Sequence, residues 1–141
     1  MTKKVAIIGG SRGIGLELVK SFADVGHEVH ILTRNQNPVF DSYTNVTYHF
    51  FDLESGNVRK QAEEISATIK NVDLLINNAG YLVSKPFPEL TSEDFTRCYQ
   101  VNAIGIMETV QGFLANLNPN SAHIVNISSI GGYQGSVKFA G

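Results

Sequence analysis

A glycine-rich segment close to the N-terminus has the residue types and spacing of a phosphate-binding turn. Its residues are Gly9, Gly10, Ser11, Arg12, Gly13, Ile14 and Gly15. Gly9 permits a tight exit from a strand, Gly13 lets the backbone approach a pyrophosphate, and Gly15 allows a helix to pack closely on the strand. The unpaired amides and positive dipole end of that helix attract the same anion. The position between a β-rich run and a helical pattern favours dinucleotide binding over an ordinary glycine-rich turn.

Two arginines near this turn indicate which dinucleotide would fit. NAD-binding proteins generally place an acidic residue after the second strand to accept hydrogen bonds from ribose hydroxyls, whereas NADP-binding proteins place arginine nearby. Here the second β-rich run ends in Thr33-Arg34-Asn35 without a carboxylate, and Arg12 directly precedes Gly13. Two guanidinium groups can hold one phosphate with charge-assisted hydrogen bonds. The residues therefore favour NADP(H) over NAD(H), the alternative being two solvated surface arginines.

Small polar residues also follow the third, fourth and fifth β-rich runs. Asp52-Leu53 follows the third run, where Asp52 could equally be a charge at a helix N-terminus. Asn77-Asn78-Ala79-Gly80 follows the fourth run, and its asparagines can bond to neighbouring strands while Ala79 and Gly80 leave room for a cofactor. Ser129 lies in a loop of small residues after the fifth run, where its hydroxyl could hydrogen-bond a carbonyl oxygen.

A long helix is predicted from Thr91 to Leu117, with Thr91 and Asp94 forming an approximate capping box. One stripe at spacings of three and four contains Phe95, Cys98, Tyr99, Asn102, Ile106, Val110, Phe113 and Leu117. Asn102 is the only amide in this stripe, so we expect it to be buried and hydrogen-bonded. Its simplest purpose is to tie the helix to a neighbouring backbone. Cys98 is expected to be a small core residue.

Strand and helix patterns alternate along the chain, which predicts a parallel sheet with helices on both faces. Strands are expected at residues 5–8, 29–32, 46–51, 72–76 and 123–127, and helices at 14–25, 55–70 and 91–117. Residues 34–45 are expected to form mostly loop, because Pro38 and several asparagines disfavour a long helix.

Composition limits the classes of function. The 141 residues are 43% hydrophobic and 17% charged, which predicts one globular domain over residues 1–141. A net charge of −2 without a basic run argues against a nucleic-acid or anionic-membrane partner. The single cysteine excludes an intramolecular disulfide, and no cluster has zinc-site spacing, so no metal is expected. No signal peptide or membrane span is recognisable, so we expect a cytoplasmic protein.

These motifs together resemble the short-chain dehydrogenase/reductase family over essentially the whole chain. The turn has that family's longer Gly-x-x-x-Gly-x-Gly spacing, and Asn77-Asn78-Ala79-Gly80 matches its asparagine motif, although Ile8 stands where the family usually has threonine. The resemblance implies a Rossmann-type doubly wound sheet of order 3-2-1-4-5 and hydride transfer between NADP(H) and a carbonyl or alcohol. It implies an adenine contact at Asp52 and Leu53, the catalytic serine at Ser129, and at Asn102 the tetrad asparagine that holds a proton-relay water.

The family also uses a Tyr-x-x-x-Lys acid/base pair, which the resemblance places just beyond Gly141. Tyr81 and Lys85 match the spacing, but they precede Ser129, and Pro86 disfavours helical geometry at Lys85. We therefore expect the N-terminal portion of a family member, without its C-terminal strands and inactive by itself.

The fifth strand of such an N-terminal portion would be an open edge of the sheet, which promotes self-association as a homo-oligomer. The alternatives are a catalytically dead nucleotide-binding or interaction module, and a complete flavodoxin-like protein, which explains the asparagine motif and serine loop poorly.

Overall fold

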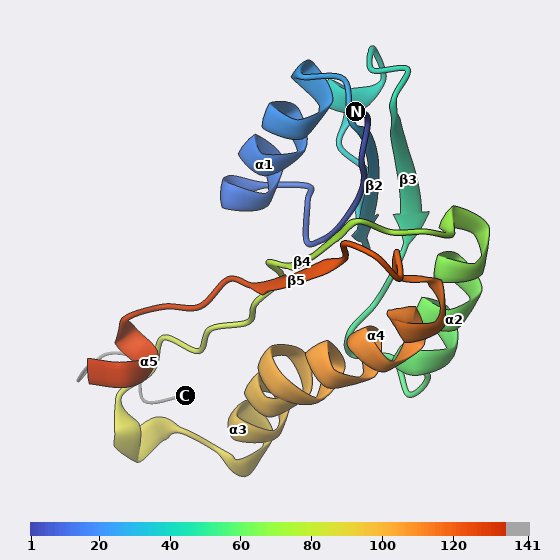
Figure 1. The fold of residues 1–141 in the computed structure, drawn as a ribbon. Coiled ribbons are helices and arrows are strands. Elements are labelled where there is room, and N and C mark those ends of the chain that lie inside the picture. The colour runs from blue at the N-terminus through green and yellow to red at the C-terminus, as the bar shows by residue number, and fades with distance from the viewer. Residues whose placement is uncertain (135–141) are drawn as a thin grey trace.

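Short apolar runs that end in polar or small residues form a parallel sheet. The computed structural model describes residues 1–134. Its strands are β1 (Lys4–Ile8), β2 (Glu28–Thr33), β3 (Val46–Phe50), β4 (Leu74–Asn77) and β5 (His123–Asn126). All neighbouring strands are parallel, and their order is β3-β2-β1-β4-β5 (Figure 1). The predicted α/β fold class and strand order are confirmed.

Helices lie between the strands except between β2 and β3, where residues 34–45 form a loop with one short 3-10 turn, as predicted. The helices are α1 (Gly13–Asp24), α2 (Val58–Ile69), α3 (Ser92–Tyr99), α4 (Gly105–Phe113) and α5 (Gly131–Gln134). α2 begins later than expected because Asp52 opens a turn: its carboxylate accepts from the Glu54 amide at 3.0 Å and its carbonyl from the Ser55 amide at 3.2 Å. Short 3-10 turns lie at Pro38–Phe40, Phe87–Glu89 and Leu114–Asn116.

The single long helix expected over residues 91–117 is wrong. α3 and α4 are separated by a π-helical turn at Gln100–Ile104, in which the Gly105 amide bonds to the Gln100 carbonyl. The capping box at the start of α3 is confirmed, because the Thr91 hydroxyl accepts from the Asp94 amide at 3.2 Å and the Asp94 carboxylate from the Thr91 amide at 3.0 Å. A π turn adds a residue to the helical repeat, and this turn contains Asn102.

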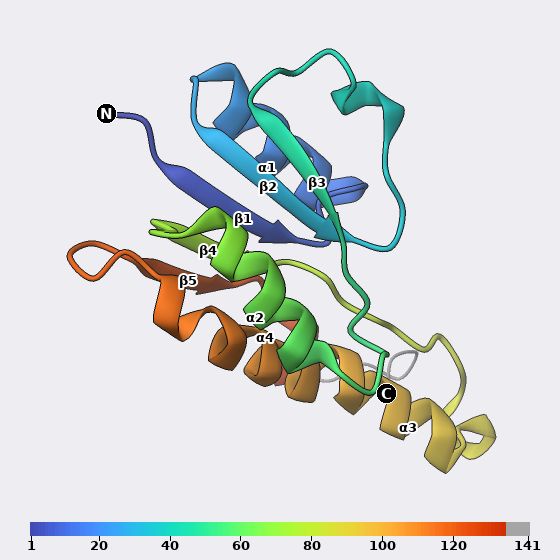
Figure 2. The same cartoon turned by 90° about the vertical axis from the view of Figure 1, so that its right-hand side faces the viewer.

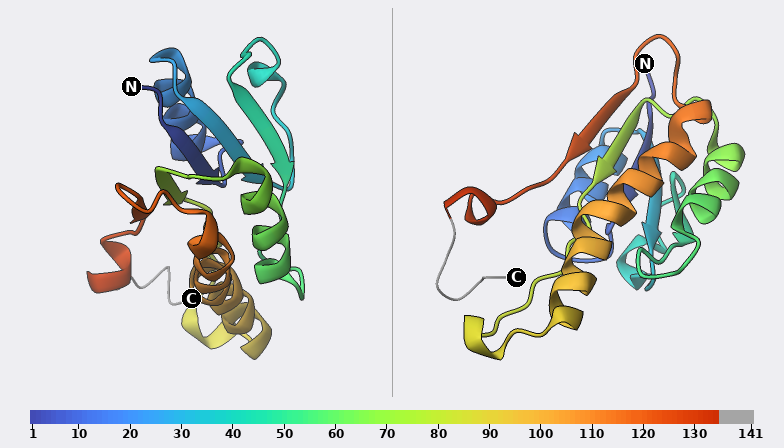
Figure 3. Two further views of the ribbon diagram at one scale, coloured as in Figure 1. Left: turned by 45° about the vertical axis from the view of Figure 1, so that its right-hand side comes forward. Right: turned by 90° about the horizontal axis from the view of Figure 1, so that it is seen from below.

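The sheet is buried between two helical layers. α1 covers one face at β1 and β2, and α2 and α4 pack side by side on the opposite face (Figure 2). Alternate residues of β1 enter the two cores, with Val5 and Ile7 facing α1 while Ala6 and Ile8 face the other helices. Figure 3 shows β5 at one margin of the sheet, where all four of its residues are exposed.

The predicted stripe is confirmed in part, because Cys98 and Phe113 are buried and Val110 and Leu117 pack against the core. Tyr99 is 64% exposed and Asn102 is also exposed, so the expected burial of this amide is wrong. The buried positions of α4 are Gly105, Thr109, Gly112 and Phe113. A Cβ on Gly112 would lie 2.5 Å from the Ala62 Cβ, so the small residue lets α4 approach α2 very closely. The close approach of α4 to α2 therefore determines that small residues, as well as large apolar ones, are buried on α4.

Within residues 1–134, no helix has both the length and the apolar character that crossing a membrane requires. The same residues contain no grouping of three or more histidine, cysteine, aspartate or glutamate side chains suited to a metal ion.

Candidate functional site

A crevice of about 850 Å³ lies at the carboxyl ends of the central strands. In the sheet β2 is the neighbour of β1 on one side and β4 is its neighbour on the other, so the strand order reverses at β1. The crevice therefore lies at a topological switch point. In open α/β sheets ligands bind at such points. The predicted cofactor residues that line it are Gly9, Ser11, Arg12, Gly13, Ile14, Arg34, Asp52, Leu53, Asn78, Ala79 and Gly80.

Three glycines of the turn, Gly9, Gly10 and Gly15, are held by close packing. A Cβ on Gly9, whose φ is +82°, would lie 2.7 Å from the Ala79 Cα, and one on Gly15 would lie 2.5 Å from the Asn78 Nδ2. Gly10 lies behind the lining, where a Cβ would be 2.7 Å from Ile31. Beside Gly13, whose φ is +55°, nothing comes within 4 Å of the Cβ position. The turn is therefore tightly packed at Gly9, Gly10 and Gly15 and open beside Gly13.

The N-terminus of α1 faces this open space. Arg12 is its N-cap residue, and in the described structure no side chain caps this end and no acidic residue lies in the first turn. The first amides of a helix have no partners within it. They are therefore available to an anion in the crevice.

Asn77, the last residue of β4, and Asn78, which follows it, connect three strands. The Asn78 amide nitrogen donates to the Gly9 carbonyl at 2.8 Å, which joins the ends of β1 and β4. The Asn77 amide nitrogen donates to the Asn126 side-chain oxygen at 2.8 Å, which joins β4 to β5. The prediction of a backbone contact is confirmed for Asn78, whereas Asn77 bonds to a side chain.

The segments that carry the two arginines lie against each other. The hydroxyls of Ser11 and Thr33 are 3.3 Å apart, and the Asn37 side-chain nitrogen Nδ2 donates to the Ser11 backbone carbonyl at 2.9 Å. Arg12 and Arg34 consequently border the same end of the crevice. Arg34 is about half exposed and its guanidinium forms an ion pair with Glu54 at 2.9 Å.

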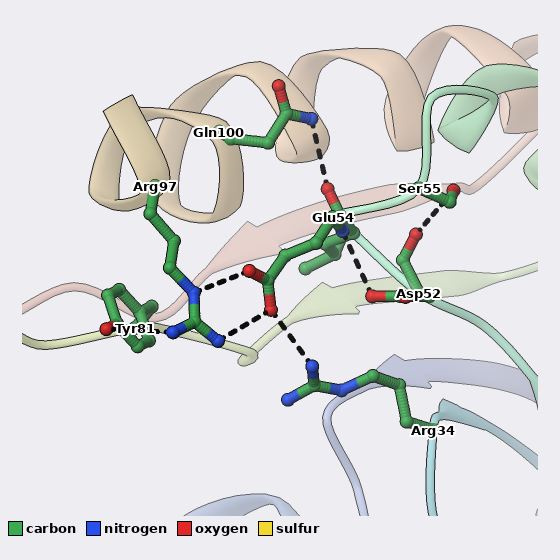
Figure 4. Close-up of polar contacts among 8 residues, drawn as sticks. Arg34, Asp52, Glu54, Ser55, Tyr81, Arg97 and Gln100 are labelled. Carbon is green, nitrogen blue, oxygen red and sulfur yellow. Dashed lines mark hydrogen bonds and ion pairs between the residues drawn. The ribbon is translucent and has the colours of Figure 1, made fainter. Parts of the chain in front are cut away.

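Glu54 joins two arginines at the rim of the crevice, as Figure 4 shows. Its carboxylate accepts from Arg34 at 2.9 Å and from two nitrogens of Arg97 at 2.5 and 3.1 Å. The guanidinium of Arg97 lies 4.1 Å from the centre of the Tyr81 ring and donates to the hydroxyl of the same tyrosine at 3.1 Å. Hydrogen bonding and charge from the arginines hold the pKa of Glu54 below its ordinary value. Glu54 is therefore ionised at neutral pH.

Asn102 fixes the loop that follows β4. Its side-chain oxygen accepts from the Tyr81 amide and its nitrogen donates to the Tyr81 carbonyl, both at 2.8 Å. The side chain thus pairs with both backbone groups of one residue. The prediction that Asn102 ties the helix to a neighbouring backbone is confirmed, although the amide does so at an exposed position.

Comparison with known proteins agrees with this geometry. A family model described as short chain dehydrogenase matches residues 3–141. The chain belongs to the short-chain dehydrogenase family. Carbonyl reductase family member 4 from Xenopus laevis is 30% identical over 142 residues, which cover 97% of this chain and 60% of that protein.

Two solved structures of this family give the same result. A short chain dehydrogenase from Leptospira borgpetersenii with bound NAD⁺ has a TM-score of 0.85 at 32% identity, covering 96% of this chain and 55% of that one. A variant of ElxO with NADPH bound has a TM-score of 0.85 at 30% identity, covering 96% and 59%. The chain thus spans little more than half the length of these family members.

The structure also places Ser129, Tyr81 and Lys85, which the sequence analysis considered for roles in the reaction. Ser129 is exposed after β5, apart from the crevice lining, and its Oγ accepts from the Gly131 amide at 3.1 Å. Tyr81 and Lys85 lie in a non-helical segment, and the Lys85 ammonium bonds to Asp94 at 2.8 and 2.9 Å while Tyr81 contacts Arg97. Their match to the acid/base spacing is therefore a coincidence of sequence, as expected. The position expected for that pair, just after Gly141, lies outside the described residues.

Several lining residues were not predicted. Glu54, Tyr81, Val101, Gln36 and Asn37 line the crevice in addition to the expected set. For Glu54 a signal was present, because it directly follows Asp52-Leu53 at the end of a strand. The participation of Tyr81 depends on contacts with Arg97 and Asn102, which no local pattern indicates.

Proposed function

We propose that the chain binds NADP(H) as the cofactor-binding portion of an oxidoreductase, one that transfers hydride between the nicotinamide and a small-molecule carbonyl or alcohol. The observation that carries the proposal is the switch-point crevice, in which the glycine turn, an uncapped helix N-terminus and two arginines border one space. Open space beside Gly13 together with tight packing at Gly9 and Gly15 supports a dinucleotide phosphate there. NADP(H) supplies or accepts the hydride when it is bound.

Each part of the crevice has a proposed task. The amides at the start of α1 would hold the pyrophosphate, and Arg12 and Arg34 the 2′-phosphate. Asp52 and Leu53 would contact the adenine. Asn78, Ala79 and Gly80 would border the remainder of the cofactor, because they line the crevice beyond β4.

Ser129 and Asn102 are proposed to serve the reaction itself. The Ser129 Oγ already accepts one hydrogen bond, so its hydroxyl hydrogen is available to donate to a substrate carbonyl oxygen. The side-chain oxygen and nitrogen of Asn102 each make one bond to Tyr81, and we propose that Asn102 also holds the relay water. We also propose that copies of the chain associate, a tendency that the exposed edge strand β5 supports.

Cofactor preference tests the proposal directly. We expect the purified chain to bind NADPH at least about tenfold more tightly than NADH, because two guanidinium groups would meet the 2′-phosphate. Arg34→Asp should narrow or invert this ratio, as measured by fluorescence titration. Lys60→Asp makes the same charge change on the exposed surface of α2 and should leave the ratio unaltered. Equal affinity of the unmutated chain for both cofactors would contradict the assignment.

A further inference from the structure

Glu54 occupies an unusual position for an acidic residue near a phosphate-binding crevice. It comes from the end of β3, yet its carboxylate reaches Arg34 at the end of β2 and Arg97 on α3 (Figure 4). Two anions can therefore bind the single guanidinium group of Arg34. One is the Glu54 carboxylate, and the other is the 2′-phosphate of the proposed cofactor.

The two arginines differ in how firmly they are held. Arg97 makes two hydrogen bonds to Glu54, lies over the Tyr81 ring and bonds to the Tyr81 hydroxyl. The Tyr81 backbone is in turn fixed by Asn102. Arg34 makes one bond to Glu54, and its side chain is 51% exposed. Arg34 can consequently leave Glu54, whereas Arg97 keeps the carboxylate in place.

We propose that Glu54 competes with the 2′-phosphate for Arg34 and thereby sets the preference between NADP(H) and NAD(H), while Arg97 weakens this competition by holding and neutralising the carboxylate. The inference rests on the proposed function. Glu54 is the specificity-determining residue, and Arg97, which does not line the crevice, is a positioning residue.

Charge gives the sign of each effect. A 2′-phosphate carries nearly two negative charges at neutral pH, so a carboxylate next to Arg34 both occupies its donor and repels the incoming group. Removing the carboxyl charge frees Arg34 for the phosphate. Removing Arg97 leaves Arg34 as the remaining partner of Glu54 among the contacts described, so the carboxylate binds Arg34 more strongly and its charge is less fully compensated. The two variants should therefore shift 2′-phosphate affinity in opposite directions.

The experiment uses probes that isolate the adenine end of the cofactor. Binding of 2′,5′-ADP and of ADP is measured by calorimetry at low salt for the unmutated chain, Glu54→Gln and Arg97→Gln. Glu54→Gln should tighten 2′,5′-ADP about fivefold and change ADP little, whereas Arg97→Gln should weaken 2′,5′-ADP by a similar factor. The gain from Glu54→Gln should disappear when Arg34→Gln is also present.

A matched control separates this effect from a general change of charge. Glu63→Gln removes a carboxylate that pairs with Arg59 at 2.8 Å on the exposed surface of α2, and it should leave both affinities unchanged. Urea unfolding of each variant shows whether it is folded, and Arg97→Gln provides an independent test should Glu54→Gln not fold.

The possible failures are distinguishable. Unmutated protein that prefers 2′,5′-ADP over ADP, with the same preference in Glu54→Gln and Arg97→Gln, would overturn the competition but leave the proposed function standing. An unmutated chain that binds neither probe would overturn both.

Discussion

Single glycines in the turn between β1 and α1 are favoured for different physical reasons. Gly9 has φ +82° and lies against Ala79, so both its backbone angle and its missing side chain matter. Gly13 has φ +55° but faces open space, so its backbone conformation alone favours glycine. Gly15 is part of α1 and is required because the helix passes close to the Gly9 carbonyl and to Asn78. A side chain at Gly9, Gly13 or Gly15 should therefore destabilise the turn for a different reason at each position.

The sharpest test at this scale is Gly15→Ala. The new methyl group would overlap the Gly9 carbonyl and the Asn78 side chain, so α1 must move away from the turn. We expect the free energy of unfolding in urea to fall by about 1–3 kcal/mol. Gly56→Ala is the matched control, because nothing lies within 4 Å of its Cβ position and its φ is not positive; its effect should stay within about 0.5 kcal/mol. Equal stability of the two variants would show that the contact does not constrain α1.

The crevice residues that were predicted could be found because they lie after the ends of strands. Parallel strands bring their carboxyl ends to one edge, so Asp52 and Asn78 could be placed together from their positions alone. The ion pair of Glu54 with Arg97 joins residues far apart in the sequence and depends on where α3 lies relative to β3. Its formation is a property of the tertiary packing, which composition and spacing do not report.

At the scale of elements, the region from α3 to α4 departs most from the pattern of its sequence. A stripe of large apolar residues predicted the buried face, yet Gly105, Thr109 and Gly112 are buried and Tyr99 is exposed. The helical spacing of large apolar side chains predicts that they form the buried face, whereas close packing of α4 on Ala62 requires small residues there. The start of α3 was predictable because a capping box is a local device. The π turn is not signalled by any local residue pattern.

Asn102 provides the test at this scale. Asn102→Ala removes the partners of both the Tyr81 amide and the Tyr81 carbonyl, and water can replace them only partly. We expect a loss of about 1 kcal/mol in the local opening free energy and hence about fivefold faster hydrogen exchange at the Tyr81 amide. Met107→Ala, an exposed position of α4, should not change that exchange. Unchanged exchange in Asn102→Ala would mean that the loop is held by other contacts.

For the whole molecule, alternation of strands and helices was sufficient to predict the layers, whereas the strand order was predicted from the family resemblance. The alternation could not predict how polar side chains pair inside those layers. On the α2 side of the sheet, His30 from β2 is buried and its Nδ1 lies 2.9 Å from the Nε2 of His49 on β3. The other nitrogen of His30 bonds to Glu28 at 2.9 Å, and Lys4 lies 3.8 Å from the same carboxylate. This arrangement makes the stability of the fold depend on pH.

Burial, followed by the charge of His30, lowers the pKa of His49 below its ordinary value of about 6.5. The unfolded chain therefore binds more protons than the folded one as pH falls through that value. Stability is fully present above about pH 6.5 and declines as pH falls toward the folded pKa of His49. The pKa values of Asp73, bonded to the Lys4 amide, and Asp94, paired with Lys85, are also lowered, but these carboxylates lose their stabilising effect only below about pH 4.

Urea unfolding between pH 7.5 and 5 should isolate the histidine contribution, because the carboxylates remain ionised throughout that range. We expect the free energy of unfolding to fall with pH in the unmutated chain and to fall less steeply in His49→Gln, which cannot bind the additional proton. His123→Gln, at an exposed position of β5, is the matched control and should keep the original slope. If His49→Gln and the unmutated chain lost stability in parallel, the pair between β2 and β3 would not be the source of the pH dependence, and protonation elsewhere in the molecule would have to account for it.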